Sequence, residues 1–286
     1  MEVHRRPGNL NGRSVELVLM NLAAEVARRA GDLVANGRAA GGFEFATKSS
    51  PTDVVTEWDA ASERFIESFI ARHRPDDGMI GEEGTASAGT SGVSWLVDPI
   101  DGTTNFLYGL PGWAVSVAAI ETTTGLTLAG AVHVPSQRET FVAARGHGSW
   151  LGGRRLDVRS RTERPAPTLS TALVATGFGY DTERRRRQGR RAAWLLPRVR
   201  DIRRFGAAAV ELCHVAAGRV DAYVEDGLGA WDIAAGTLVA TEAGAVATDF
   251  AGGPVRPAEV LVAHPDIHTG IIELLHSCPG DEEWPG

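Results

Sequence analysis

Apolar residues in the first part of the chain recur at the spacing of a helix. Between Ser14 and about residue 35 they fall at Val15, Val18, Leu19, Leu22, Val26, Ala30, Leu33 and Val34. This spacing gives one apolar face, and Ser14 and Gly37 are suitable residues for the start and the end of the helix. A second helix is predicted to open at Thr56, and its apolar face consists of Phe65, Ile66, Phe69 and Ile70.

After the second helix the pattern changes to short apolar runs divided by turn residues. A stretch of Thr, Ser, Ala and Gly at 85–92 predicts a mobile loop, and 95–97 predicts a short buried strand. Three β-rich runs, separated by TTTG and PSQR, follow at 113–120, 126–134 and 139–145. They predict an antiparallel meander, followed by a glycine-rich hairpin connection at 145–153.

Beyond residue 150 strand and helix patterns alternate. Strands are expected at 171–176, 219–225, 245–250 and 259–264, and helices at 205–218, 231–244 and 265–277. The sequence therefore predicts an α+β part over 14–150 and an α/β part over 151–277. We expect the two parts to pack as a single catalytic unit with a site in the cleft between them, and 1–13 and 278–286 to be flexible tails.

Composition and charge narrow the class of protein. The chain has 286 residues, of which 43% are hydrophobic, enough for a sizeable core. The net charge of -7 disfavours a nucleic acid or an anionic membrane as partner. No stretch approaches the roughly 20 apolar residues of a membrane helix, and no signal peptide is evident. Cys213 and Cys278 lack metal-ligand spacing, so a cytoplasmic protein with reduced thiols is expected.

Carboxylates interrupt apolar segments in four places. They are Asp59 in TEWDAA, Glu82 and Glu83 in IGEEG, Asp98 and Asp101 in WLVDPIDGTTNF, and Asp232 in AWDIAAG. Carboxylates gathered in one cleft raise each other's pKa unless cations, basic side chains or protons neutralise them. Basic residues are scarce around these motifs, and Lys48 lies shortly before the first of them. Oxygen ligands without His or Cys select hard cations, and the calcium-loop pattern is absent, so a Mg²⁺-type site completed by water and phosphate is predicted.

Each carboxylate also has a purely structural interpretation. Asp59 follows Thr56 by three residues, as in a helix capping box, and Asp232 could favour a helix N-terminus. The Glu82–Glu83 pair could be a solvated turn. DPIDGTTNF is harder to explain in this way, because a turn needs one Asp and one Gly rather than two Asp followed by hydroxyl and amide side chains.

GEEG, DPIDGTTNF and WDIAAG, in this order, resemble the inositol monophosphatases. These are Mg²⁺-dependent, lithium-sensitive enzymes of a superfamily that includes fructose-1,6-bisphosphatases and adenosine bisphosphate phosphatases. The resemblance extends from KSSPTDVVT at 48–56 to WDIAAGTLVATEAGA at 231–245. It implies a layered αβαβα sandwich, a homodimer, and hydrolysis of a small phosphorylated polyol or sugar, in the first place myo-inositol 1-phosphate.

The resemblance also implies a role for individual residues. The ligands of two or three Mg²⁺ ions would be Glu82, Asp98, the Ile100 carbonyl, Asp101 and Asp232. Asp59, Glu82 and Thr103 would activate the attacking water. Substrate contacts would come from Asp101, Gly102, Thr103, Ala208, Glu225 and Asp232, with Lys48 and Glu83 nearby. The chain departs from the family at Ala207, where a Ser or Thr is usual, which bears on substrate preference.

Three alternatives stay open at this point. An aspartyl-phosphate phosphatase would carry DxD, whereas this chain has DxxD with proline after the first Asp. Histidinol phosphate, fructose 1,6-bisphosphate or another sugar phosphate could replace inositol phosphate, since all share the phosphate chemistry. The arginine-rich stretch TERRRRQGRR at 182–191 would suit a regulatory or nucleic-acid-binding protein, but a solvated helix face explains it more simply.

Overall fold

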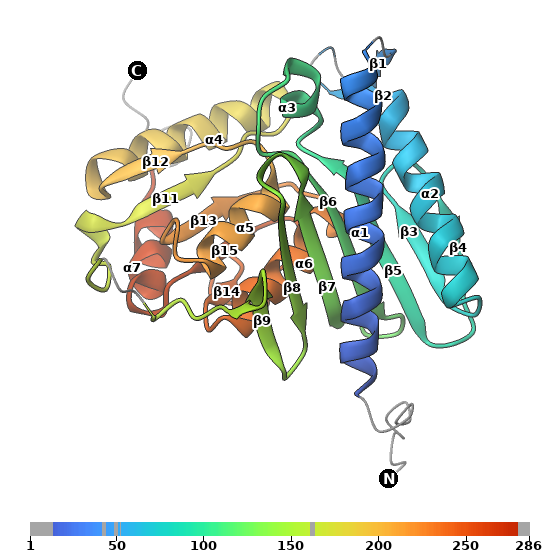
Figure 1. The fold of residues 1–286 in the computed structure, drawn as a ribbon. Coiled ribbons are helices and arrows are strands. Elements are labelled where there is room, and N and C mark those ends of the chain that lie inside the picture. Colours follow the sequence, from blue (N-terminus) through green and yellow to red (C-terminus); the bar gives the residue numbers. More distant parts are fainter. Residues whose placement is uncertain (1–13, 42–43, 49–50, 52, 161–163, 280–286) are drawn as a thin grey trace.

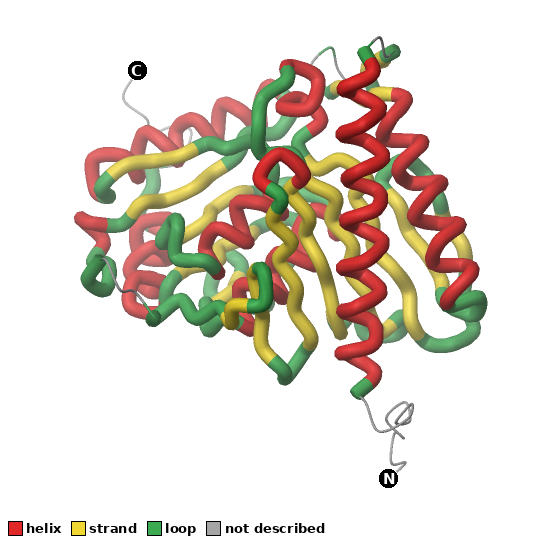
Figure 2. Tube along the Cα trace, in the orientation of Figure 1, coloured by secondary structure: helices red, strands yellow, loops and turns green. Residues whose placement is uncertain are grey.

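Five layers of secondary structure alternate through the molecule, in the order helices, sheet, helices, sheet, helices (Figures 1 and 2). The computed structural model describes residues 14–41, 44–48, 51, 53–160 and 164–279. The predicted αβαβα sandwich is confirmed. The tails expected at 1–13 and over most of 278–286 lie outside the described residues.

The first layer consists of α1 (Val15–Ala40) and α2 (Glu57–His73), which lie side by side over an eight-stranded sheet (Figure 1). The strand order of this sheet is β10-β9-β8-β7-β6-β5-β3-β4. The strands are β3 (Gly78–Gly81), β4 (Ala86–Ser87), β5 (Val93–Asp101), β6 (Ala114–Glu121), β7 (Thr127–Val134), β8 (Glu139–Ala144), β9 (Gly148–Leu151) and β10 (Arg154–Arg155). All neighbours are antiparallel except β3 and β5, so the meander is confirmed.

Three local sequence predictions need correction in this sheet. The strand predicted at 95–97 is much longer, because β5 continues through the aspartates to Asp101. The loop at 85–92 contains the short strand β4, and the glycine-rich connection at 145–153 contains β9. In each case pairing with a neighbouring strand, which a local pattern does not reveal, extends the sheet.

The central strands of this sheet are buried on both faces. On β6, Val115 and Val117 pack toward α1 and α2, whereas Ala114 and Ala118 pack toward the middle layer of helices. A strand covered on both faces reads as a continuous apolar run instead of an alternating one. This explains why the sequence shows WAVSVAAI without polar alternation.

The middle layer contains α5 (Ala208–Ala216) and α6 (Ala230–Glu242), which pack between the two sheets. The second sheet has the order β12-β11-β13-β15-β14. Its strands are β11 (Leu173–Thr176), β12 (Asp201–Arg203), β13 (Ala222–Glu225), β14 (Val246–Thr248) and β15 (Val260–Ala263). The outer helices are α4 (Thr182–Leu195) and α7 (Pro265–His276), and α7 packs on β15.

Two small elements complete the fold near the first layer. β1 (Phe45–Thr47) and β2 (Val54–Thr56) form a two-stranded sheet that leads into α2, and α3 (Thr103–Tyr108) follows β5 directly. Among the described helices, none is both long and apolar enough to cross a membrane. Cys213 is buried, Cys278 is half-buried, and neither forms a disulfide.

Gly37 does not end the first helix, as the sequence suggested. The helix α1 continues to Ala40, and Gly41, with φ of 79°, ends it. A Cβ atom at position 37 would overlap the indole of Trp58 on α2. Gly37 therefore permits the close packing of α1 on α2, and it does so inside the helix, where glycine is otherwise unfavourable.

This contact predicts an inverted effect of a glycine-to-alanine change. Alanine normally stabilises a helix interior by about 0.5–1 kcal/mol, and Gly189→Ala in α4 should do so, because no atom lies within 4 Å of the added Cβ. Gly37→Ala should instead destabilise by about 1–3 kcal/mol, since the Trp58 indole must move. Urea unfolding of both variants measures the difference, and equal stabilisation would contradict this packing.

Candidate metal and phosphate site

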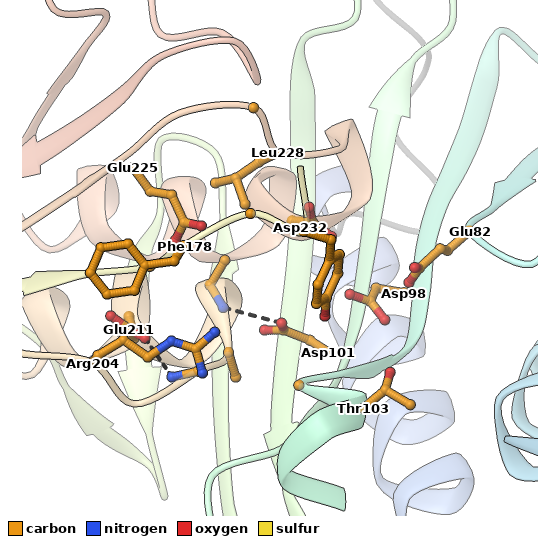
Figure 3. A pocket seen from close by; sticks show the side chains of 18 of the residues that line it. Glu82, Asp98, Asp101, Thr103, Phe178, Arg204, Glu211, Glu225, Leu228 and Asp232 are labelled. Atoms are coloured by element: carbon orange, nitrogen blue, oxygen red, sulfur yellow. Dashed lines mark hydrogen bonds between the residues drawn. The ribbon is translucent and has the colours of Figure 1, made fainter. Parts of the chain in front are cut away.

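A pocket of about 170 Å³ opens where the two sheets and the middle helices meet. Its walls come from the end of β5, from the segment that follows β11, and from the beginnings of α5 and α6. Figure 3 shows Glu82, Asp98, Asp101 and Asp232 on one side, and Phe178 and Arg204 together with Glu211 and Glu225 on the other. Both sides carry carboxylates, but the second also carries a guanidinium and an aromatic ring.

Three carboxylates converge on the acidic side of the pocket. Glu82 follows β3, Asp98 lies in β5, and Asp232 lies in the first turn of α6; one oxygen of each is within 4.8 Å of the others. Burial, followed by the charges of neighbouring carboxylates, raises the pKa of Asp98 well above its ordinary value. Burial also raises the pKa of Asp232 to about 6. This acidic cluster can hold a metal ion, which would remove the mutual repulsion.

A bulge in β5 explains the DxxD spacing. Residues three apart on a regular strand point to opposite faces, so Asp98 and Asp101 would be separated by the sheet. The pairing of β5 with β6 shifts register between these two residues, and the Asp98 carboxylate accepts the Ile100 amide at 3.0 Å. The extra residue turns both aspartates toward the same pocket.

Asp101 binds the beginning of α5. Its two oxygens accept the amide hydrogens of Ala208 at 3.1 Å and of Ala209 at 2.7 Å. Ala207, the N-cap of this helix, has no side chain that could accept them. The carboxylate thus caps, from a distant part of the chain, a helix whose own cap residue lacks a hydroxyl. Asp101 lines the pocket but lies outside the group of three converging carboxylates.

Asp59 combines the helix cap that its sequence context suggested with a contact to Thr103 at the pocket. One oxygen accepts from the backbone N–H and the hydroxyl of Thr56, at 2.7 and 2.6 Å, which forms the capping box of α2. The other accepts from the Thr103 hydroxyl at 3.3 Å. That hydroxyl is also 3.0 Å from the Ile100 carbonyl. Burial raises the pKa of Asp59 to about 6.

Asp232 likewise combines a structural contact with a place in the acidic cluster. One of its oxygens accepts the Gly229 amide at 2.6 Å, at the start of α6. The capping explanation therefore does not compete with a place at the site, because a carboxylate has two oxygens.

Lys48, the only lysine in the sequence, balances part of the negative charge of the cluster. The Lys48 ammonium lies 3.0 Å from Glu82 and 2.5 Å from Glu83. Burial opposes the charge of Lys48, but Glu82 and Glu83 outweigh it and raise its pKa above the ordinary value. The Glu83 carboxylate contacts Lys48. Glu83 is not one of the three converging carboxylates. Burial raises the pKa of Glu83 to about 7.

The model of the Inositol monophosphatase family matches residues 17–279. The chain belongs to the inositol monophosphatase family. It is 42% identical to the inositol-1-monophosphatase SuhB of Mycobacterium tuberculosis over 296 aligned positions, covering 98% of this chain and 99% of the relative. It is 38% identical to the Nus factor SuhB of Pasteurella multocida, covering 92% and 98%. The crystal structure of the suppressor protein SuhB from Bartonella henselae superimposes with a TM-score of 0.82 at 33% identity, covering 91% and 99%.

Opposite the acidic cluster, this inositol monophosphatase family member places Glu225 at the end of β13. The Glu225 carboxylate accepts the Tyr223 hydroxyl at 2.5 Å, and burial raises its pKa to about 7. A Cβ at position 177 would overlap this carboxylate, so Gly177 gives Glu225 its room. Ala208 lines the same pocket through the start of α5.

Several residues of the site were not foreseen from the sequence. Phe178, Tyr180 and Arg204 line the pocket. Glu63, outside the pocket lining, accepts the amides of Glu83 and Thr85, both at 2.9 Å, in the segment that carries Glu82. The stretch TGFGYD, with two glycines around an aromatic residue, was a usable signal for Phe178 and Tyr180. Glu63 could have been noticed as a carboxylate beside the apolar face of α2.

The arginine-rich stretch forms α4, as the simpler interpretation predicted. Two of its members support the pocket: Arg184 donates to the Gly227 carbonyl at 2.8 Å, and Arg191 pairs with Asp226 at 2.8 Å. Arg185, Arg186 and Arg187 are exposed. Part of this charge therefore fixes the turn between β13 and α6.

Proposed function

We propose that this chain is a Mg²⁺-dependent phosphomonoesterase that releases phosphate from myo-inositol 1-phosphate. The observation that carries the proposal is the convergence of Glu82, Asp98 and Asp232, from three separate segments, within 4.8 Å. Membership of the inositol monophosphatase family supports the same chemistry. The name of the relative from Mycobacterium tuberculosis supports the choice of inositol 1-phosphate.

The donor set fits a hard divalent cation. We propose that the three converging carboxylates hold two or three Mg²⁺ ions together with Asp101 and the Ile100 carbonyl, because these ligands are all oxygens. When bound, such ions lower the pKa of a coordinated water and stabilise charge on the phosphoryl oxygens. The protein's part is to keep the oxygens close together in a buried pocket, which costs repulsion when no cation is present.

Asp59 and Thr103 are suited to orient the attacking water. The Thr103 hydroxyl donates toward Asp59 or the Ile100 carbonyl, so its oxygen is free to accept from a water. Asp59, whose pKa burial raises to about 6, can take the water proton near neutral pH. Gly102, with φ of 87°, lets the backbone approach the phosphate where a side chain would not fit.

The substrate panel that tests the function compares four phosphate esters at saturating Mg²⁺. Myo-inositol 1-phosphate should be hydrolysed faster than histidinol phosphate, fructose 1,6-bisphosphate and a simple sugar phosphate, and lithium should inhibit. Phosphate release is the readout. Faster release from fructose 1,6-bisphosphate or histidinol phosphate would move the chain to another branch of the superfamily, and activity without a divalent cation would contradict the proposed site.

We also propose that the protein is a homodimer, as the family resemblance implies. Light scattering of the purified protein can test this.

The raised pKa of Glu225 predicts that the pH dependence of activity differs between substrates. We propose that its carboxylate accepts hydrogen bonds from the inositol hydroxyls. Because its pKa is raised to about 7, the group is charged above that pH and neutral below it. The kcat/KM for inositol 1-phosphate should therefore fall by up to about tenfold per pH unit below 7. For p-nitrophenyl phosphate, which lacks the polyol, the fall should begin only near pH 6, where Asp59 becomes protonated. Identical pH profiles of kcat/KM for the two substrates would show that Glu225 does not bind the polyol.

A further inference from the structure

The turn between β12 and α5 is held from two sides. On one side, the Asn105 amide nitrogen donates to the Phe205 carbonyl at 2.7 Å and to the Gly112 carbonyl at 3.2 Å. On the other side, one oxygen of Glu211 accepts the amide hydrogens of Phe205 at 3.1 Å and of Gly206 at 2.8 Å. Glu211 lies in α5 itself, so the helix folds its own side chain back onto the turn that precedes it.

This turn lies directly against Gly102, where the backbone is proposed to approach the phosphate. Gly102 and Gly206 both have positive φ, of 87° and 93°. A Cβ on Gly102 would be 3.0 Å from the Gly206 carbonyl and 3.1 Å from the Ala207 side chain. The backbone at Gly102 and the turn at Gly206–Ala207 are therefore tightly packed. Because α5 begins directly after this turn, a displacement of the turn also moves the start of α5. The amides that bind Asp101 belong to that start.

Glu211 is an unusual residue for such a place. It is 1% exposed, and its second oxygen has no hydrogen-bond partner among the described residues. Burial raises its pKa well above the ordinary value; the charges of Glu225 and Asp101 add to this, and that of Arg204 opposes it. An incompletely hydrogen-bonded buried carboxyl costs stability. We therefore look for the role of Glu211 in the two backbone amides that it binds.

We propose that Glu211 is a positioning residue: it fixes the turn at 205–207 so that the first amides of α5 hold the Asp101 carboxylate at the metal site. The inference rests on the proposed function, because it takes Asp101 as part of the metal-binding set. It assigns to Glu211 no contact with substrate or metal. Its effect passes through Gly206, the start of α5 and Asp101 in that order.

Two variants separate positioning from folding. Glu211→Gln keeps an oxygen that can accept both amides and should stay within about threefold of the wild type in every parameter. Glu211→Met has a similar length and suits a buried place, but it accepts no hydrogen bond. It should raise the Mg²⁺ concentration for half-maximal activity by about tenfold or more, as loss of a residue that orients a metal ligand does.

A matched control addresses general loosening of the helix. Val215→Ala also lies in α5 and is buried in the core, but the turn and Asp101 are not among its hydrogen-bond partners. It should lower thermal stability and leave the Mg²⁺ dependence unchanged. Each protein is assayed for phosphate release against Mg²⁺ concentration and for thermal unfolding.

The outcomes are distinct. An increased Mg²⁺ requirement in Glu211→Met, restored in Glu211→Gln, supports the proposal. A Glu211→Met protein with wild-type Mg²⁺ dependence overturns it, as does a Glu211→Gln protein that behaves like Glu211→Met. If the wild type itself releases no phosphate with Mg²⁺, the proposed function fails instead.

Discussion

Asp101→Asn should lower the turnover of inositol 1-phosphate by about 10³-fold or more, which corresponds to about 4 kcal/mol of transition-state stabilisation. The change removes a negative charge from the proposed metal-binding set. It also replaces one acceptor by an NH₂ group, which cannot accept from Ala208 or Ala209, whereas the aspartate accepts from both. The start of α5 therefore loses part of its cap together with the charge.

Steady-state phosphate release over a range of Mg²⁺ concentrations measures this effect, and circular dichroism checks that the fold is kept. Asp201→Asn is a matched control, because it is the same chemical change at a partly exposed residue of β12 whose carboxylate contacts only its neighbours Ile202 and Arg203 among the described residues. It should retain wild-type turnover. Near-normal Mg²⁺-dependent activity of Asp101→Asn would show that Asp101 has been assigned wrongly.

Asp98→Asn should abolish activity and yet stabilise the metal-free protein near pH 8. Asp98 is buried beside other carboxylates, and its charge is repelled when no cation is present. The neutral asparagine removes that repulsion and can still accept the Ile100 amide. Mg²⁺ should stabilise the wild type, by about 2.7 kcal/mol at 100 times its Kd, and should stabilise the variant much less.

The same charges give the metal-free wild type a characteristic pH dependence. Folding raises the pKa of Asp98, and raises that of Asp232 to about 6, so the folded state binds protons more tightly than the unfolded state. The free energy of unfolding should therefore fall as the pH rises from about 4 through 6 and above. Asp98→Asn should flatten this slope.

Urea unfolding in EDTA at pH 5 and pH 8 tests both statements, and repeating it in Mg²⁺ tests the linkage to metal. Equal stabilisation of wild type and variant by Mg²⁺ would mean that the ion binds away from Asp98. A metal-free stability that rises with pH would mean that the carboxylates are neutralised by another group.

The sequence predicted those parts of the fold that depend on local pattern. Apolar periodicity placed α1 and α2, and turn residues placed the meander of β6, β7 and β8. The end of α1 was wrong because Gly37 is explained by Trp58, a residue of another helix. The length of β5 was wrong because the strand continues into a bulge that its pairing with β6 defines.

The acidic residues were recognisable because each breaks an apolar segment, but their contacts were not. No local signal shows that Asp101 caps α5, more than 100 residues away. No local signal shows, either, that Lys48 lies between Glu82 and Glu83. The capping explanations for Asp59 and Asp232 were treated as alternatives to function. In the structure each carboxylate caps a helix and also lies at the site: Asp59 contacts Thr103, and Asp232 is one of the three converging carboxylates.

Asp59, Asp101 and Asp232 each have an oxygen bound at the beginning of a helix, namely α2, α5 and α6. Their side-chain orientations are consequently fixed when the helices form, not when a substrate arrives. An acid held in this way needs little reorganisation to reach its working geometry, and this preorganisation is a large part of what an active site contributes over water. The stability of three helix ends and the readiness of the site thus depend on the same hydrogen bonds.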